Sequence, residues 1–91
     1  MDLRWTGKSL SDLARLYEFL VPVNKSAAAR VIQALAQAPA ILLTNPRIGE
    51  QLFQFEPREV RRILIRQYEI RYEIQGEVIY VLRLWHSRED R

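Results

Sequence analysis

The sequence predicts an α+β fold in which an N-terminal strand and an antiparallel helix hairpin precede a three-stranded antiparallel sheet. Apolar residues recur at helical spacing over residues 10–21 and again over residues 28–42. From residue 60 the pattern changes to an alternation of period two, which is typical of strands. The chain has 91 residues and no linker-like segment, so we expect one domain over residues 1–91.

The first elements are predicted to be a short strand and a helix. Leu3 and Trp5 alternate with polar neighbours, as in a strand. Thr6 or Ser9 is a candidate N-cap for the helix, and Pro22 is expected to end it. The predicted apolar stripe comprises positions 10, 13, 14, 17, 20 and 21, with Lys8, Ser11, Asp12, Arg15 and Glu18 on the opposite side.

A second helix is predicted after a short connection, which makes the two helices an antiparallel hairpin. Asn24 or Ser26 is its candidate N-cap. Pro39 lacks a backbone N–H and is expected to kink this helix or to split it. The predicted stripe that faces the sheet consists of Ala28, Val31, Ile32, Leu35 and Leu42.

The second half of the chain is predicted to form the sheet. Residues 50–59 are expected to be irregular, with Phe53 and Phe55 in the core. Gln75-Gly76-Glu77 is a predicted hairpin turn. The almost wholly apolar segment from 78 to 85 favours a central strand covered on both faces. The sheet face away from the helices is expected to be open and basic, with Arg62 or Arg61, Arg66, Glu69, Arg71, Glu73 and Arg83.

The composition excludes several kinds of chemistry. There is no cysteine, which excludes a disulfide scaffold and a thiol nucleophile and suits the cytoplasm. With one histidine and no spaced carboxylates, neither a metal site nor a cofactor is expected. The N-terminus lacks a signal-peptide core, and the longest apolar patches are interrupted by Arg or Pro, so no membrane segment is expected.

Arginine dominates the basic residues, since 12 of the 14 are Arg at a net charge of +3. The guanidinium fork binds carboxylate or phosphate at two points, so an Arg-rich sheet favours an anionic partner. The acids interleaved with these arginines weaken the nucleic-acid interpretation and leave cross-strand ion pairs on a solvated face as the alternative. The candidate binding residues are Arg61, Arg66, Arg71, Arg83, His86 and Arg88.

His86, the only histidine, has two interpretations. Near Arg83 and Arg88, it could be a general acid or base in RNA cleavage, with a Glu as the second proton carrier and an Arg as the cation on the phosphate. Alternatively, it ends the last strand and fixes the tail through hydrogen bonds to the backbone or to Asp90. The structural interpretation is favoured because no second proton carrier is evident in the sequence.

Two segments resemble the RelE/ParE superfamily of bacterial toxins, and ParE-like toxins in particular. NPRIGEQL at 45–52 is similar to the family's Pro-x-x-Gly turn after the second helix. EVRRILIRQYEIRYEIQGEVIYVLRLWHSRED at 59–90 is similar to its sheet, with a Tyr-rich strand, a glycine turn and a terminal strand that ends in His. The resemblance covers almost the whole chain.

The resemblance implies the toxin of a type II toxin–antitoxin system, an inhibitor rather than an enzyme. Such a toxin would act in the cytoplasm on DNA gyrase, block replication and arrest growth, without reading a nucleic-acid sequence directly. A cognate antitoxin, ParD-like or similar, would neutralise it within a higher toxin–antitoxin assembly. An antitoxin helix is then expected to contact Leu13, Tyr17 and Leu20.

The alternative within the superfamily is a RelE-like ribosome-dependent mRNA endoribonuclease, in which His86, Arg83 and Arg66 would be catalytic. The sequence departs from that branch, because Glu69 stands where many such enzymes place Arg in the Tyr-rich strand. The sheet also lacks lysine, and the chain ends at Arg91 rather than Tyr. These departures favour the ParE branch.

Overall fold

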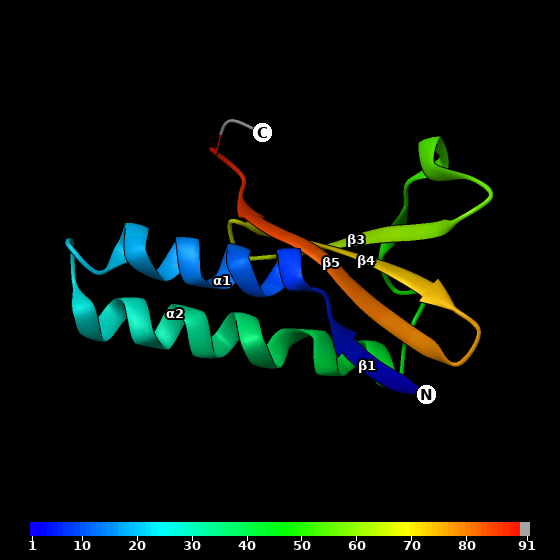
Figure 1. Cartoon of the computed structure of the whole chain (residues 1–91), viewed down its shortest axis with the longest axis horizontal. Helices are drawn as coiled ribbons and strands as arrows, with labels where there is room; N and C mark the ends of the chain where they lie inside the picture. The colour runs from blue at the N-terminus through cyan, green and yellow to red at the C-terminus, as the bar shows by residue number, and fades with distance from the viewer. Residues whose placement is uncertain (90–91) are drawn as a thin grey trace.

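Two helices lie side by side against one face of a twisted sheet in the computed structural model, which describes residues 1–89 (Figure 1). The helical layer contains α1 (Gly7–Leu20), α2 (Lys25–Gln37) and the 3₁₀ segment η1 (Ala38–Leu43). The strands are β1 (Asp2–Trp5), β2 (Glu50–Gln51), β3 (Glu59–Ile65), β4 (Tyr68–Gln75) and β5 (Val78–His86), and a short 3₁₀ turn, η2 (Phe53–Phe55), follows β2.

The predicted α+β class is confirmed, but the sheet is larger than predicted. Its strand order is β1-β5-β4-β3-β2, and β1 runs parallel to β5 at one edge. The other edge is β2, which the sequence did not reveal. Glu50 and Gln51 pair with Arg62 and Arg61 of β3. A strand of two residues is too short to show an alternating pattern, and for this reason the sequence predicted an irregular segment over residues 50–59.

The helix boundaries follow the predicted signals. The Thr6 side chain caps α1 by accepting a hydrogen bond from the Ser9 N–H, and Asn24 caps α2 by accepting from the Ala27 N–H. Pro39 ends the regular helix, because α2 stops at Gln37 and continues as the tighter η1. The turn at Gly76, with φ of 58°, closes the β4–β5 hairpin as predicted.

The buried face of α1 differs from the predicted stripe. Ser9, Asp12 and Leu16 are buried, whereas Leu10 is exposed. Residues 9, 12 and 16 have helical spacing, so the helix is rotated toward this side. Asp12 was predicted to face solvent, and this was wrong because its carboxylate bonds to β5.

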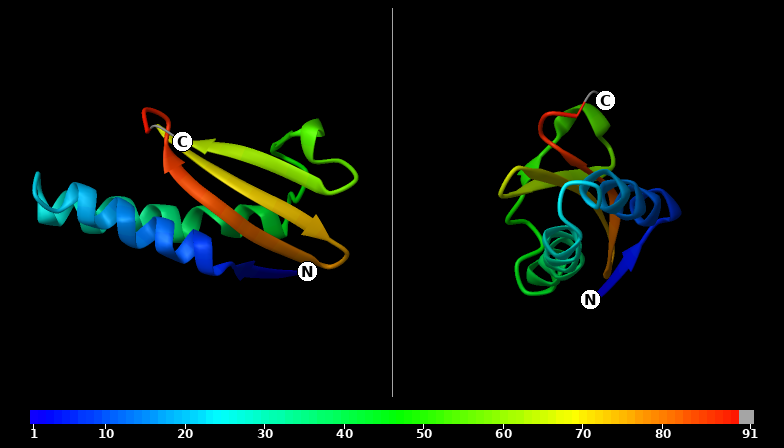
Figure 2. Two further views of the ribbon diagram at one scale, coloured as in Figure 1. Left: turned by 45° about the horizontal axis from the view of Figure 1, so that its top comes forward. Right: turned by 90° about the vertical axis from the view of Figure 1, so that its left-hand side faces the viewer.

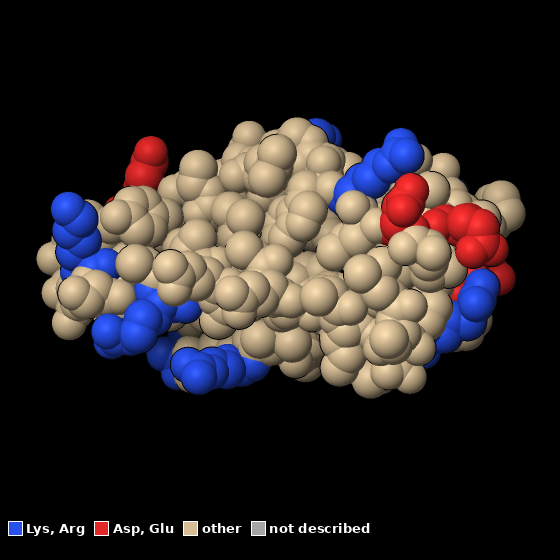
Figure 3. Space-filling view, turned by 90° about the horizontal axis from the view of Figure 1, so that it is seen from below, with Lys and Arg blue, Asp and Glu red and all other residues tan. Residues whose placement is uncertain are grey.

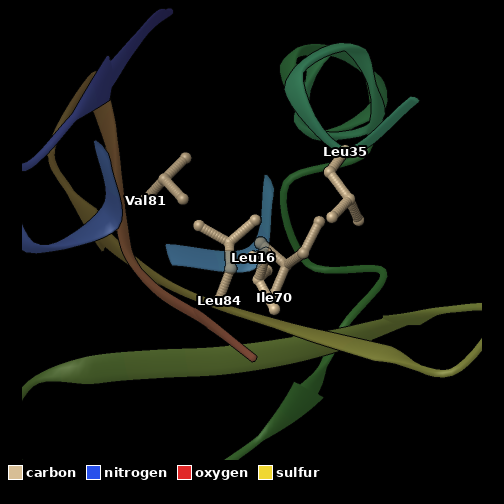
Figure 4. Packing of buried hydrophobic residues seen from close by; sticks show 5 residues of the cluster. All are labelled: Leu16, Leu35, Ile70, Val81 and Leu84. Carbon is tan, nitrogen blue, oxygen red and sulfur yellow. The ribbon is translucent and has the colours of Figure 1, made fainter. Parts of the chain in front are cut away.

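The helices and the sheet form two layers (Figure 2), and the main hydrophobic core joins residues of both. Figure 4 shows how Leu16 and Leu35 meet side chains from the two central strands. The predicted stripe of α2 is confirmed, since Ala28 and Leu35 are buried and Val31 and Ile32 are partly buried. Phe53 was predicted in the core but is exposed. A second cluster joins Leu42, Tyr72, Ile74 and Ile79.

The stretch Lys25–Leu43, which unites α2 and η1, passes a test of length and composition for a membrane span, with a mean hydropathy of 1.3. The sequence predicts no such segment, because Arg or Pro interrupts the longest apolar patches. The face seen from below carries its charged side chains toward the two ends and few between them (Figure 3). One such helix is weak evidence for a span, since core helices pass the same test and Leu35 and Leu42 are buried here.

Candidate functional site

A groove of about 560 Å³ opens between the C-terminal half of α1 and the ends of β4 and β5. Leu16, Phe19 and Leu20 contribute an apolar wall, and Phe19 is 75 % exposed. Large exposed aromatic side chains at a concave surface favour contact with a partner. The opposite wall comes from Gln67, Tyr68, His86, Arg88 and Glu89.

The His86 ring is fixed on this wall by contacts on three sides. Its Nδ1 accepts a hydrogen bond from the Arg88 N–H at 3.1 Å, so Nδ1 carries no proton while this bond is made. Its Nε2 lies 3.0 Å from Gln67 Oε1, and the ring meets Tyr68 edge to face at 5.1 Å. The backbone N–H of His86 donates to Glu89. These contacts fit a histidine that ends the strand and holds the tail, while Asp90 lies outside the described residues.

The residues of the ribonuclease hypothesis do not come together. His86 pairs with Tyr68 on the helix side of the sheet, whereas Arg83 pairs with Arg71 on the other side. Arg66 lies in the β3–β4 turn, with φ of 55°. Proton transfer to a phosphodiester needs an acid, a base and a cation around one phosphate. Because His86 and Arg83 lie on opposite sides of the sheet, the three side chains do not form such a cluster.

The sheet face away from the helices carries a row of three arginines. Arg62, Arg71 and Arg83 are register partners across β3, β4 and β5. Arg71 lies 4.8 Å from the centre of the Trp85 ring, and Arg83 lies 5.4 Å from it on the same ring. Cation–π contacts of this kind attract the guanidinium groups to the indole ring. Trp85 therefore supports the arginine row.

Carboxylates neutralise most of this row, contrary to the expectation of an open basic face. Glu69 is 2 % exposed and lies between two guanidinium groups, 3.3 Å from Arg62 and 3.1 Å from Arg71. Glu73 is also buried, and Arg58 holds it at 2.7 Å. The Arg58 hydrogen bonds lower the pKa of Glu73 below its ordinary value. Both glutamates were predicted to be solvated, and this was wrong.

Arg83, at the end of the row, is held by Asp12 of α1. The Asp12 carboxylate accepts from Arg83 Nε at 2.8 Å and from the buried Leu84 N–H at 2.9 Å. Strand β1 ends opposite Val81, so this carboxylate takes the place of a strand beside β5. Burial would raise the pKa of Asp12, but the hydrogen bonds from Arg83, Leu84 and Arg15 lower it overall.

The remaining candidate arginines lie elsewhere. Arg61 faces the helix side with Tyr72 and bonds to Glu59 at 3.0 Å and to the Gly49 carbonyl at 2.8 Å. The exposed side chains of Arg66 and Arg88 meet no carboxylate at salt-bridge distance within residues 1–89. Arg66 and Arg88 are thus the two candidates best placed to meet a partner's acid.

The three residues expected to contact an antitoxin helix lie in different surroundings in the structure. Leu13 packs against the core cluster of Leu16 and Leu35. Tyr17 is half-buried on α1. Only Leu20 lines the groove, together with Phe19, which the predicted set omitted. Helical periodicity alone cannot show that Phe19 lines a groove. Its place there depends on how α1 lies against the ends of β4 and β5.

Comparisons with known proteins agree with this architecture. The family model described as the ParE toxin of the type II toxin–antitoxin system parDE matches residues 3–91. The chain therefore belongs to the ParE toxin family. Its fold is shared by a solved structure titled "Chromosomal ParDE TA system from P. aeruginosa", with a TM-score of 0.78 and 22% sequence identity over 94% of this chain and 95% of that one. No curated protein matches the sequence.

Proposed function

We propose that this ParE-family toxin inhibits DNA gyrase and so blocks DNA replication in the cytoplasm until a cognate, ParD-like antitoxin binds it. The family model over residues 3–91 carries the proposal. The geometry supports inhibition by binding, because His86 and Arg83 lie on opposite faces of the sheet. The protein would act without a cofactor and without cutting a substrate.

Overproducing the chain in bacteria tests this assignment. Trapped gyrase should stop growth and give filamentous cells with DNA-damage signalling, while protein synthesis continues. Co-expression of the antitoxin should restore growth. Early collapse of translation with codon-positioned cuts in message would favour the ribonuclease alternative, and those cuts would disappear in His86→Ala and Arg83→Ala.

The groove beside α1 is the proposed docking site for an apolar helix of the antitoxin. Phe19 and Leu20 form an apolar wall that a helix with residues at i, i+3 and i+4 could cover. Arg88 lies on the rim without a carboxylate partner among residues 1–89, so an acidic residue of the antitoxin would meet it. Burial of a large aromatic residue such as Phe19 is a common source of binding energy.

Phe19→Glu is expected to weaken antitoxin binding at least about 10-fold, because it places a charge in the apolar wall. The side chain is mostly exposed, so the free toxin should stay folded. Val23→Glu is the matched control, since Val23 is 84 % exposed and does not line the groove. Titration calorimetry measures both affinities. Equal affinities for the two variants would rule the groove out as the docking site.

A further inference from the structure

Strand β1 forms an edge of the sheet, and its outer side pairs with no other strand among residues 1–89. It ends the strand order β1-β5-β4-β3-β2 and lies at the border of the sheet in both views of Figure 2. Its inner side pairs with β5, in register from Asp2 and Val78 to Trp5 and Val81. An uncovered edge of this kind is a template for pairing with another chain.

Alternate residues of β1 direct their backbone groups to this edge. The N–H groups of Asp2 and Thr6 donate to carbonyls of β5 and of the turn before it, at 2.8 Å and 3.2 Å. The backbone groups of every second residue in a strand share a direction, so Arg4 faces β5 as well. Leu3 and Trp5 therefore direct their N–H groups outward, where no other backbone group within residues 1–89 accepts from them.

The side chains of β1 alternate between an apolar face and a charged face. Leu3 and Trp5 are partly buried and pack against the core on the helix side. Asp2 and Arg4 lie on the other face, with 72 % and 61 % of their side chains exposed, and Arg4 Nη2 lies 3.9 Å from Asp2 Oδ2. Charges on an edge strand normally prevent association, because symmetric pairing sets like charges opposite each other.

The spacing of these two charges instead favours one register between two copies. A two-fold antiparallel pair must set outward-facing residues opposite each other, so its centre falls on Asp2, Leu3 or Arg4. Centring on Asp2 or on Arg4 brings two like charges together. Centring on Leu3 sets Asp2 of each copy opposite Arg4 of the other, which gives two ion pairs. On the helix side, the same register sets Leu3 against its copy and Met1 against Trp5.

We propose that two copies of this chain associate through the edges of β1, antiparallel and centred on Leu3, so that two five-stranded sheets become one. Leu3 of each copy donates to and accepts from Leu3 of the other, as in any hydrogen-bonded antiparallel pair. Strand β1 has only four residues, so the dimer is weak and forms at high concentration. The groove at α1 has no lining residue in β1, so the two contacts are separate.

Charge-swap variants test the register by sedimentation equilibrium of the free chain, with any affinity tag at the C-terminus. The wild type should dimerise as its concentration rises. Asp2→Arg and Arg4→Asp each turn both ion pairs into like-charge pairs, so each should weaken dimerisation at least about 10-fold. The double variant has opposite charges in the same register and should return to within about 3-fold of the wild type.

A control separates the register from the change in net charge. Arg30→Asp alters the net charge as Arg4→Asp does, but it lies exposed on α2, so it should leave dimerisation nearly unchanged. The side chains of Asp2 and Arg4 are mostly exposed, so these variants should stay folded, and circular dichroism checks this.

Amide hydrogen exchange followed by NMR provides a second measurement on the wild type. Exchange at the Leu3 and Trp5 amides should slow as the concentration of the chain rises, because the second copy accepts from them or covers them. The Arg4 amide faces β5 and should change little, so it is the internal reference.

Four outcomes would overturn the proposal. The wild type could stay monomeric up to about 1 mM. Either single variant could dimerise as tightly as the wild type, or the double variant could fail to recover. Finally, protection of Leu3 that depends on added antitoxin and not on the concentration of the chain would assign this edge to the antitoxin instead.

Discussion

Replacing Asp12 with alanine is expected to lower the free energy of unfolding by about 3 kcal/mol, because a buried N–H and two guanidinium groups lose one acceptor. The Leu84 N–H contributes most of this loss, since it is buried and donates to the Asp12 carboxylate at 2.9 Å. Arg83 and Arg15 are more than 40 % exposed, so water screens their share. Urea unfolding of the variant should show a lower midpoint at an unchanged slope.

Asp12→Asn separates the hydrogen bond from the charge. Its amide oxygen can still accept from Leu84, so it should cost less than alanine. Ser11→Ala, one residue away on the exposed side, is the matched control and should change stability little. A loss at Asp12→Ala no larger than at Ser11→Ala would show that the carboxylate does not hold the β5 edge.

The contribution of Asp12 to the free energy of unfolding should decrease as the pH falls. Its pKa in the folded protein lies below the ordinary value of 3.8, so the unfolded chain binds the proton more readily. The stabilisation is therefore complete well above pH 3.8 and is lost as the pH falls through the lower folded value. The difference in unfolding free energy between wild type and Asp12→Asn should shrink over that acidic range, and a constant difference would contradict this origin.

Gly49→Ala is expected to cost about 2–3 kcal/mol, because an added methyl group has no space. A Cβ at this position would lie 2.6 Å from the Arg62 carbonyl oxygen and 2.6 Å from the Tyr72 hydroxyl. That hydroxyl accepts from the Gly49 N–H at 3.0 Å and donates to the Pro46 carbonyl at 2.7 Å. The Pro-x-x-Gly turn thus closes around the buried Tyr72, and the methyl group would force it open.

Gly7→Ala is the control for this substitution. A Cβ at Gly7 meets nothing within 4 Å, and the residue begins α1, where alanine is the better helix former. Gly7→Ala should therefore be neutral or slightly stabilising. Thermal unfolding should place Gly49→Ala roughly 10 °C or more below Gly7→Ala. Equal midpoints would mean that the turn does not pack against Tyr72 as described.

The features that the sequence predicted are those encoded locally. Thr6 and Asn24 each cap a helix by accepting from a backbone N–H three residues away, and Pro39 and Gly76 act on their own backbone. The period-two pattern from residue 60 is also local, because alternate side chains of a strand lie on the same face of the sheet and one face is buried. The sequence also predicted that His86 ends the last strand, because His86 directly follows an apolar run.

The features that the sequence did not predict depend on which segments meet in space. A charged residue on a helix is normally solvated, and Asp12 is buried only because β1 ends early and leaves β5 unpaired there. The apolar Leu16 lies four residues after Asp12 and therefore on the same helix face, so it was the one sequence signal that this face is buried. The composition showed many arginines and acids, but not that Glu69 would lie buried between Arg62 and Arg71.

The proposed mode of action is tested most directly by the supercoiling activity of purified gyrase on relaxed plasmid as the toxin is titrated. Supercoiling is expected to fall with increasing toxin and to return when the antitoxin is added, while ribosome-bound message stays intact. Normal supercoiling at a large molar excess of folded toxin would contradict it.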